Sequence, residues 1–224
     1  ALLNNTTAHN NTAVGYHSLL TNTTGTKCVA VGAYALDASN ADDNTAVGYS
    51  AMTENTTGIR NAALGQSALG ANTTGTRNTA IGAQALDASS TASYNTAIGY
   101  GSLTENTTGE YNTAVGQGSL LLNTTGQYNT AVGAAALDAN TTSNNNTAVG
   151  YNAFGANTSG SEGTAIGKSA LEANTTGESN TAMGHIALAT NTTGSNNTAI
   201  GRGALNANTT ADDNTSVGYY ALSG

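Results

Sequence analysis

A unit of 17 residues recurs along the whole 224-residue chain, and this repeat limits the possible folds more than any other feature. The consensus of the unit reads N-T-A-[VIL]-G-x-x-A-L-x-x-N-T-T-G-x-x. Its first glycine stands at Gly15, Gly32, Gly48, Gly65, Gly82, Gly99, Gly116, Gly133, Gly150, Gly167, Gly184, Gly201 and Gly218. Eleven of the twelve intervals are 17 residues long and one is 16. A fixed period indicates stacked identical units, so the sequence predicts a solenoid.

The residue types within the unit favour strands over helices. In N-T-A-V-G, Thr and Val share one face of a strand, and Asn and Ala share the other. Thr, Val and Ile favour strands, whereas frequent Gly and the Asn-Thr-Thr-Gly segment would break a helix. Seventeen residues accommodate two short strands and two turns, with Gly15 and Gly25 suited to positive φ or close backbone approach. We therefore expect an all-β, parallel β-solenoid (β-roll) of about 13 coils, forming a single domain over 1–224.

Two apolar positions in each unit vary in shape but never become polar, which is typical of a core. One position precedes the glycine, and the other lies four residues after it. The predicted core comprises Val14, Leu19, Val31, Leu36, Val47, Met52, Ile81, Leu86, Val132, Leu137, Val149 and Phe154. The small residue before the first position, as in Ala13 and Ala30, predicts a tightly approached surface that neighbouring chains could share.

Stacked coils would place the asparagines of the Asn-Thr-Thr segments above one another. Each amide could then donate to one neighbour and accept from the other. The predicted ladder comprises Asn22, Asn55, Asn72, Asn106, Asn123, Asn140, Asn157, Asn174, Asn191 and Asn208. Cys28 replaces an asparagine of the unit, and we interpret it as a small substitute in the ladder, with an exposed thiol that links chains as the alternative.

Composition argues against several classes of function. The net charge of −8, with only five Lys and Arg, leaves no basic patch for nucleic acid or an anionic membrane. No apolar stretch approaches the ~20 residues that span a bilayer. His9, His17 and His185 occupy unrelated positions in their units, so they predict neither a metal site nor a catalytic triad. We expect no enzyme and no cofactor, because a repeated neutral surface offers no converged catalytic groups.

Several repeated groups have both a functional and a structural interpretation. Each Asn-Thr-Thr is formally a glycosylation acceptor, but glycans on every coil would crowd, which favours a turn within the ladder. Thr23 and Thr24 are adjacent and would point to opposite faces, which disfavours an ice-binding surface, although that alternative stays open. Asp42-Asp43 and Asp212-Asp213 suggest solvated turns rather than calcium sites. The tyrosines that follow the glycine are candidates for a contact surface: Tyr16, Tyr49, Tyr100, Tyr151 and Tyr219.

The N-T-A-V-G motif with its downstream A-L and glycine turn resembles the head repeats of trimeric autotransporter adhesins (YadA-like), in which N-S-V-A-I-G recurs. Similar runs look like those of phage tail-fibre and bacterial surface proteins. The resemblance implies a left-handed β-roll, three chains side by side and a location at the cell or virion surface. The unit is longer than the adhesin repeat, and the sequence has no stalk, neck or membrane anchor. The chain starts at Ala1 without a capping repeat, so we expect a processed product or a fragment.

These observations predict an extracellular structural or adhesive fibre that acts as a rigid shaft or an adhesin head. Alternatives are a self-assembling filament without receptor specificity, a phage tail-fibre segment and, with least support, an ice-binding solenoid. The expected partners are further copies of the chain, as a homotrimer or as a filament with end-to-end docking, and a host surface or matrix molecule. We expect no nucleic-acid partner and no membrane insertion.

Overall fold

The structure, a computed structural model, describes residues 1–224 and contains strands and turns but no helix. The chain divides into two compact units, Ala1–Tyr111 and Asn112–Gly224, and the single domain over 1–224 stays a prediction. The first unit holds β1 (Thr12–Val14), β2 (Val29–Val31), β3 (Thr45–Val47), β4 (Ala62–Leu64), β5 (Thr79–Ile81) and β6 (Thr96–Ile98). The second holds β7 (Thr113–Val115), β8 (Thr130–Val132), β9 (Thr147–Val149), β10 (Thr164–Ile166), β11 (Thr181–Met183), β12 (Thr198–Ile200) and β13 (Thr215–Val217).

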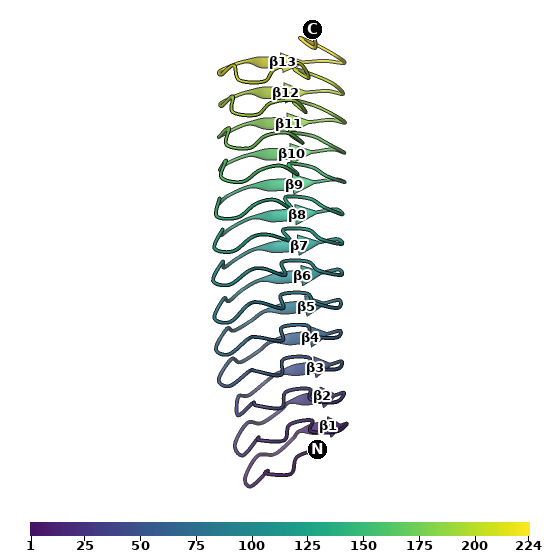
Figure 1. The fold of residues 1–224 in the computed structure, drawn as a ribbon, viewed down its shortest axis with the longest axis vertical. Coiled ribbons are helices and arrows are strands. Elements are labelled where there is room, and N and C mark those ends of the chain that lie inside the picture. The colour runs from purple at the N-terminus through teal and green to yellow at the C-terminus, as the bar shows by residue number, and fades with distance from the viewer. The chain divides into compact units, whose positions relative to one another are not determined.

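Within each unit the strands pair in chain order and run parallel (Figure 1). The register places equivalent residues of successive coils opposite each other, as in the pair Val132 and Val149. Each coil therefore adds one strand to a parallel stack, which confirms the predicted parallel β-solenoid. Because backbone donors and acceptors of one coil meet those of the next, the strands satisfy their hydrogen bonds although each is only three residues long.

The second strand expected in each coil is absent, and turns occupy that part of the unit. Hydrogen bonds still join successive coils there. The amide of Leu36 donates to the carbonyl of Ala51 at 3.1 Å, and the amide of Met52 donates to that of Ala68 at 3.0 Å. The leucine position has a left-handed backbone, with φ of 50° at Leu36 and 52° at Leu137. This conformation rules out a regular strand, because extended residues require negative φ.

The interior of each coil is formed by the leucine position and the strand alanine. Leu19, Leu36, Met52, Leu86, Leu137 and Phe154 are fully buried, as predicted. The other half of the predicted core is wrong, since Val14, Ile81 and Val132 are exposed and Val31, Val47 and Val149 are half-buried. Ala30, Ala80 and Ala131 face inward instead and are fully buried. The reason is steric: a leucine reaching across a narrow coil leaves space for only a methyl group on the strand.

This arrangement also corrects the expectation that neighbouring chains share the alanine face. That face closes against the interior of its own coil within a single chain. The face available to partners carries threonine and the aliphatic residue before the glycine, which point outward because side chains alternate along a strand.

Two columns of asparagine complete the interior. The predicted ladder is present: Asn72 donates its side-chain amide to Asn55 at 2.8 Å, and Asn191 donates to Asn174 at 2.7 Å. Each ladder amide also donates to the carbonyl of the residue three positions later, as Asn157 does to Gly160 at 2.9 Å. The Asn-Thr-Thr asparagines are buried in nearly every coil, which explains their recurrence without glycosylation.

The second column precedes the strand and was not identified from the sequence. Asn44 accepts from the backbone amide of Asn61 at 2.9 Å and donates to the carbonyl of Gly58 at 2.7 Å. The same pattern continues where Asn78 accepts from the amide of Asn95 at 3.0 Å. The side chains of these asparagines accept from the backbone amide at the start of the next strand and donate to a turn carbonyl. They therefore stabilise the stack as the first ladder does.

The glycine that directly follows each strand is required by the close approach of successive coils. Gly15 has a φ of 131°, and a Cβ placed on it would lie 2.5 Å from the carbonyl oxygen of Gly32. The equivalent glycines repeat this contact, so successive coils touch backbone to backbone. Any side chain here would separate the coils and break their hydrogen bonds.

Candidate functional site

The most repeated exposed surface is the outer face of the strands, which combines a threonine row with an aliphatic row. In the second unit the threonine row is unbroken from Thr113 to Thr215. The aliphatic row beside it includes Ile166 and Ile200, with exposed fractions of 36% and 39%. Neither row contains a charged residue in any coil. The outer face is therefore a neutral strip of methyl and hydroxyl groups without a partner in the chain.

One border of this face is the residue directly after the strand glycine, which we call the glycine edge. It contains the predicted contact tyrosines Tyr16, Tyr49, Tyr100, Tyr151 and Tyr219, all of which are exposed. Their contacts are with close neighbours on the same border. Tyr16 stacks on His17 with ring centroids 4.0 Å apart, and the Lys168 ammonium lies 5.9 Å from the centroid of Tyr151.

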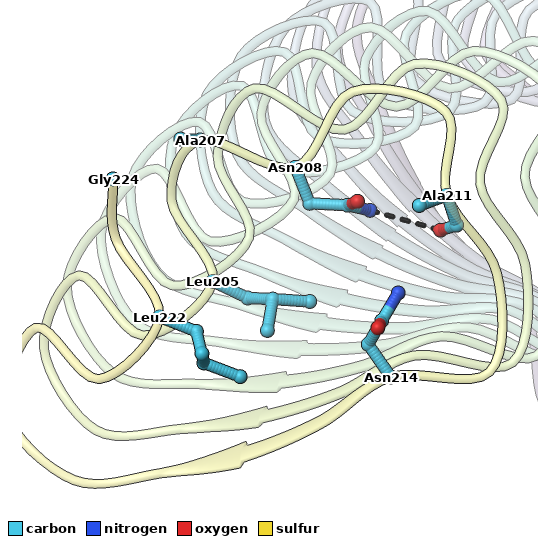
Figure 2. A pocket seen from close by; sticks show the side chains of 7 residues that line it. All are labelled: Leu205, Ala207, Asn208, Ala211, Asn214, Leu222 and Gly224. Atoms are coloured by element: carbon cyan, nitrogen blue, oxygen red, sulfur yellow. Dashed lines mark hydrogen bonds between the residues drawn. The ribbon is translucent and has the colours of Figure 1, made fainter.

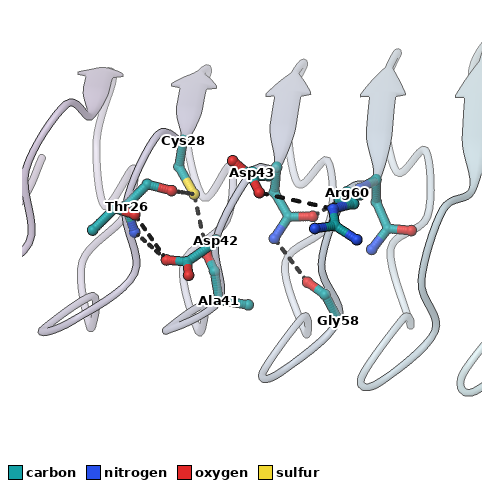
Figure 3. A network of polar contacts seen from close by, with 9 residues as sticks. Thr26, Cys28, Ala41, Asp42, Asp43, Gly58 and Arg60 are labelled. Atoms are coloured by element: carbon teal, nitrogen blue, oxygen red, sulfur yellow. Dashed lines mark hydrogen bonds and ion pairs between the residues drawn. The ribbon is translucent and has the colours of Figure 1, made fainter.

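The other border is the residue two positions before the strand, which we call the asparagine edge because an asparagine usually follows it. The guanidinium of Arg60 lies 3.9 Å from the carboxylate of Asp43 (Figure 3). Arg77 lies over the ring of Tyr94 at 5.1 Å and donates a hydrogen bond to its hydroxyl. Tyr94 in turn stacks on Tyr111 at 4.8 Å. This exposed edge was not singled out from the sequence, because its residue types change from coil to coil.

The threonines of the Asn-Thr-Thr turns have a structural role. The hydroxyl of Thr56 donates to the carbonyl of Thr73 at 3.0 Å, and that of Thr141 donates to Thr158 at 3.1 Å. Thr23 donates to the amide oxygen of Asn40 at 2.9 Å. These hydroxyls belong to the first threonine of each turn, and they join one coil to the next.

The acidic pairs lie in turns and bind backbone rather than metal. Asp42 accepts from the amide of Thr26 at 2.7 Å and from its hydroxyl at 3.0 Å (Figure 3). These bonds lower the pKa of Asp42. Asp212 accepts from the amide of Ser195 at 2.7 Å, in the equivalent place. Both pairs therefore link neighbouring turns, and no group of three or more His, Cys, Asp or Glu could hold a metal ion.

Cys28 takes the place of a second-column asparagine and is fully buried. Its Sγ lies 3.1 Å from the carbonyl oxygen of Ala41, where the asparagine amide would otherwise bind (Figure 3). Burial raises the pKa of the thiol. Cys28 is therefore a small substitute as predicted, but in the second column rather than in the Asn-Thr-Thr ladder, and its thiol is buried rather than exposed.

A third acidic group lies one residue after the buried leucine. Asp37, Asp87 and Asp138 occupy this position, three coils apart. Burial raises the pKa of Asp87, and the carboxylates of Glu105 and Glu54 raise it further. Burial also raises the pKa of Asp138. Burial therefore disfavours the ionised state of Asp87 and Asp138, and at Asp87 two nearby glutamates add to this effect.

A hollow of about 260 Å³ lies at the last coil, lined by Leu205, Asn208, Asn214 and Leu222 (Figure 2). Leu205 and the two asparagines belong to the three interior columns, and Asn208 donates to the carbonyl of Ala211 at 3.0 Å. The hollow is therefore the interior of a coil rather than a separate binding site. His9, His17 and His185 lie apart from it and from one another in the sequence.

No protein-family model matches the chain, and neither a curated protein nor a solved structure matches it. The structure contains no helix long and apolar enough to cross a membrane.

Proposed function

We propose that the chain is a load-bearing segment of an extracellular structural fibre. The observation that carries this proposal is that successive coils bury the same positions and bind the next coil in the same way. Between the two end coils, the residue at the leucine position and the strand alanine are buried, and two asparagine columns join most coils to the next. Stability is then added coil by coil, as in other repeat proteins, so a fibre of this kind can vary in length without a new fold.

The location outside the cell is part of this proposal and is supported by the resemblance of the repeat to adhesin head repeats. An adhesive role is supported by the exposed tyrosines of the glycine edge, which recur along the stack. Weak contacts that recur in this way sum through avidity, because binding of one group raises the effective concentration of the next.

Pulling on single molecules tethered at both ends tests the load-bearing role. Because each coil is held mainly by its neighbours, we expect coils to detach one after another or in small whole numbers. One detached coil of 17 residues lengthens the tether by roughly 50–55 Å, which is its extended length minus the spacing of two neighbouring strands. Force–extension curves should therefore show regular steps of this size or its multiples.

The control is the same tether in denaturant, where the curve should lack steps. A single rupture that releases the whole chain, or steps unrelated to the coil length, would contradict the proposal.

A further inference from the structure

The outer face of the strands in the second unit is a regular surface of two rows. Its threonine row is unbroken from Thr113 to Thr215, and the aliphatic row beside it includes exposed Ile166, Met183 and Ile200. The two rows contain no charged, amide or aromatic side chain in any coil. Every strand of this unit therefore presents one threonine and one apolar side chain to solvent.

The hydroxyls of the strand threonines differ from those of the turn threonines in their bonding. Thr158 and Thr175 lie in turns and donate to carbonyls of the next coil at 3.1 and 3.0 Å. Thr164 and Thr181 lie on strands, and their hydroxyls make no hydrogen bond within the chain. A hydroxyl has one donor and two acceptor sites, so the strand threonines keep their full capacity to bind water. Because threonine is branched at Cβ, its hydroxyl and methyl groups are also held in restricted directions.

The spacings of the two rows are set by the sheet itself. Neighbouring strands lie about 4.8 Å apart, and two residues along a strand span about 6.6 Å. The register places Thr164 opposite Thr181, and Ile166 opposite Met183. The rows therefore form a two-dimensional lattice of hydroxyl and methyl groups, about 29 Å long over the strands of this unit.

The interior of the coils keeps this lattice regular. Sheets normally twist, and flat sheets are stabilised by ladders of identical side chains. Inside the second unit, Asn174 donates to Asn157 at 3.3 Å and Asn191 donates to Asn174 at 2.7 Å. Successive strands of the unit keep nearly the same direction (Figure 1). A rigid surface that repeats in this way suits a ligand that itself repeats.

The chemistry of the face selects among the molecules that could cover it. Protein partners usually place tryptophan, tyrosine or arginine at the centre of an interface, and the two rows contain none of these. A polysaccharide would be held by stacked rings and by amide or carboxylate groups, which the rows also lack. The surface of ice is an uncharged lattice of water oxygens, and its repeat along the hexagonal a axis is close to the strand spacing.

We propose that the outer face of the second unit binds ice. The threonine hydroxyls would exchange hydrogen bonds with water of the lattice, and the methyl groups of both rows would fit between lattice positions. Each contact is weak, but a rigid surface loses little conformational entropy on binding, and the same contacts recur on every strand. This inference goes beyond the proposed function, since a stack can bear load whether or not its face binds ice.

The structure also shows why the sequence gives ice binding so little support. Alternation places the strand threonines on the same face as the valines predicted to be core, so only turn threonines such as Thr23 and Thr24 remain for an ice-binding surface. The structure turns the strand threonines outward instead, beside exposed Val132 and Ile166.

Ice growth in solutions of the full chain tests the proposal. The wild type should shape growing crystals and show thermal hysteresis, which is a gap between the freezing and melting temperatures. Thr164→Lys places a long charged side chain in the middle of the threonine row, and we expect it to lower the hysteresis by about fivefold or more. The substituted side chain points away from the interior, so the variant should fold, and circular dichroism checks this.

Thr176→Lys is the matched control, since it makes the same change at an exposed threonine in a turn of the same coil. It should keep the hysteresis within about twofold of wild type. Thr45→Lys tests which unit is active, because Val29 and Ala62 interrupt the threonine row on both sides of Thr45. Its effect should be smaller than that of Thr164→Lys, and an equal loss would overturn the assignment to the second unit.

A folded wild-type chain that neither shapes ice nor shows hysteresis would overturn the inference. Hysteresis that Thr164→Lys leaves unchanged would also overturn it, because the active surface would then lie elsewhere. Co-sedimentation with microcrystalline cellulose, without any effect on ice, would assign the outer face to a polysaccharide instead. Pulling on a single tethered chain does not involve ice, so failure here leaves the load-bearing role separately testable.

Discussion

At the scale of single residues, the clearest dependence between two positions is that of Phe154 and Gly163, whose side-chain sizes compensate each other. Phe154 is the only phenylalanine and occupies the buried leucine position. Gly163 stands where most coils have a second-column asparagine, and a Cβ placed on it would collide with the Phe154 ring. The larger ring therefore occupies the volume that the asparagine fills elsewhere. The amide of Gly163 still donates to Asn146 at 2.9 Å, so the backbone pattern of the column is kept.

This matching predicts strong coupling between the two positions. Gly163→Asn should destabilise the protein by about 1–3 kcal/mol or more, because the side chain has no space beside the ring. Phe154→Leu alone should cost about 1–2 kcal/mol through the cavity it leaves. The double variant recreates the common coil and should be near wild type in denaturant unfolding. Additive losses in the double variant would show that the two residues do not share one volume.

At the scale of the coil, the acidic column after the buried leucine predicts a pH effect. Burial raises the pKa of Asp87, and the nearby carboxylates of Glu105 and Glu54 raise it further. A folded-state pKa above the unfolded value favours folding fully below the unfolded pKa, and this contribution is lost as the pH rises through the folded pKa. Asp87→Asn should therefore raise the melting temperature at pH 7 by about 1–3 °C, with the difference vanishing in acid.

Asp42→Asn is the opposite control for that experiment. Hydrogen bonds from Thr26 lower the pKa of Asp42, so its contribution is present above the unfolded pKa and is lost as the pH falls through the folded pKa. The wild type should be the more stable of the two at pH 7, and the gap should close in acid. If the melting temperatures of the two variants changed with pH in the same direction relative to wild type, the environments assigned to Asp87 and Asp42 would be wrong.

The coil is also the scale at which sequence and structure can be compared. The period alone predicted the stacking, the parallel register and the Asn-Thr-Thr ladder, because identical residues 17 apart must repeat identical contacts. The period could not decide which strand residues face inward. Alternation along the strand places Val132 and Thr130 on one face and Ala131 on the other. Because valine is the more hydrophobic residue, the sequence then predicts that the valine face is the core. The structure reverses this because Leu137 fills the interior from the opposite side and leaves room only for Ala131.

The turns escaped prediction for a different reason. Leucine and tyrosine rarely adopt positive φ, yet Leu36 and Tyr34 have φ of 50° and 61°. Local preference therefore argued for a second strand, whereas closing a coil within 17 residues requires tight left-handed bends. The asparagine edge was missed because its residue types change from coil to coil.

At the scale of the whole molecule, a stack held by contacts between neighbours should respond locally to damage. Asn157 lies in the second unit, donates to Asn140 at 3.1 Å and accepts from Asn174 at 3.3 Å. Removing its amide deletes hydrogen bonds to Asn140, Asn174 and Gly160, and it leaves the buried backbone amide of Gly160 without its acceptor, at a cost of about 1–3 kcal/mol. The damage should stay near those coils, because no long-range contact carries it further.

Hydrogen exchange of Asn157→Ala tests this locality. The amides of Thr147 and Thr164, which donate to Gly163 and Asn180, should exchange about tenfold to a hundredfold faster. The amide of Thr198, which donates to Asn214, should change by less than about threefold. Ser159→Ala, at an exposed position two residues away, is the control and should change none of them. Equal acceleration at all three amides would mean that the coils of this unit open together, and a fibre built from them would then fail as a block rather than coil by coil.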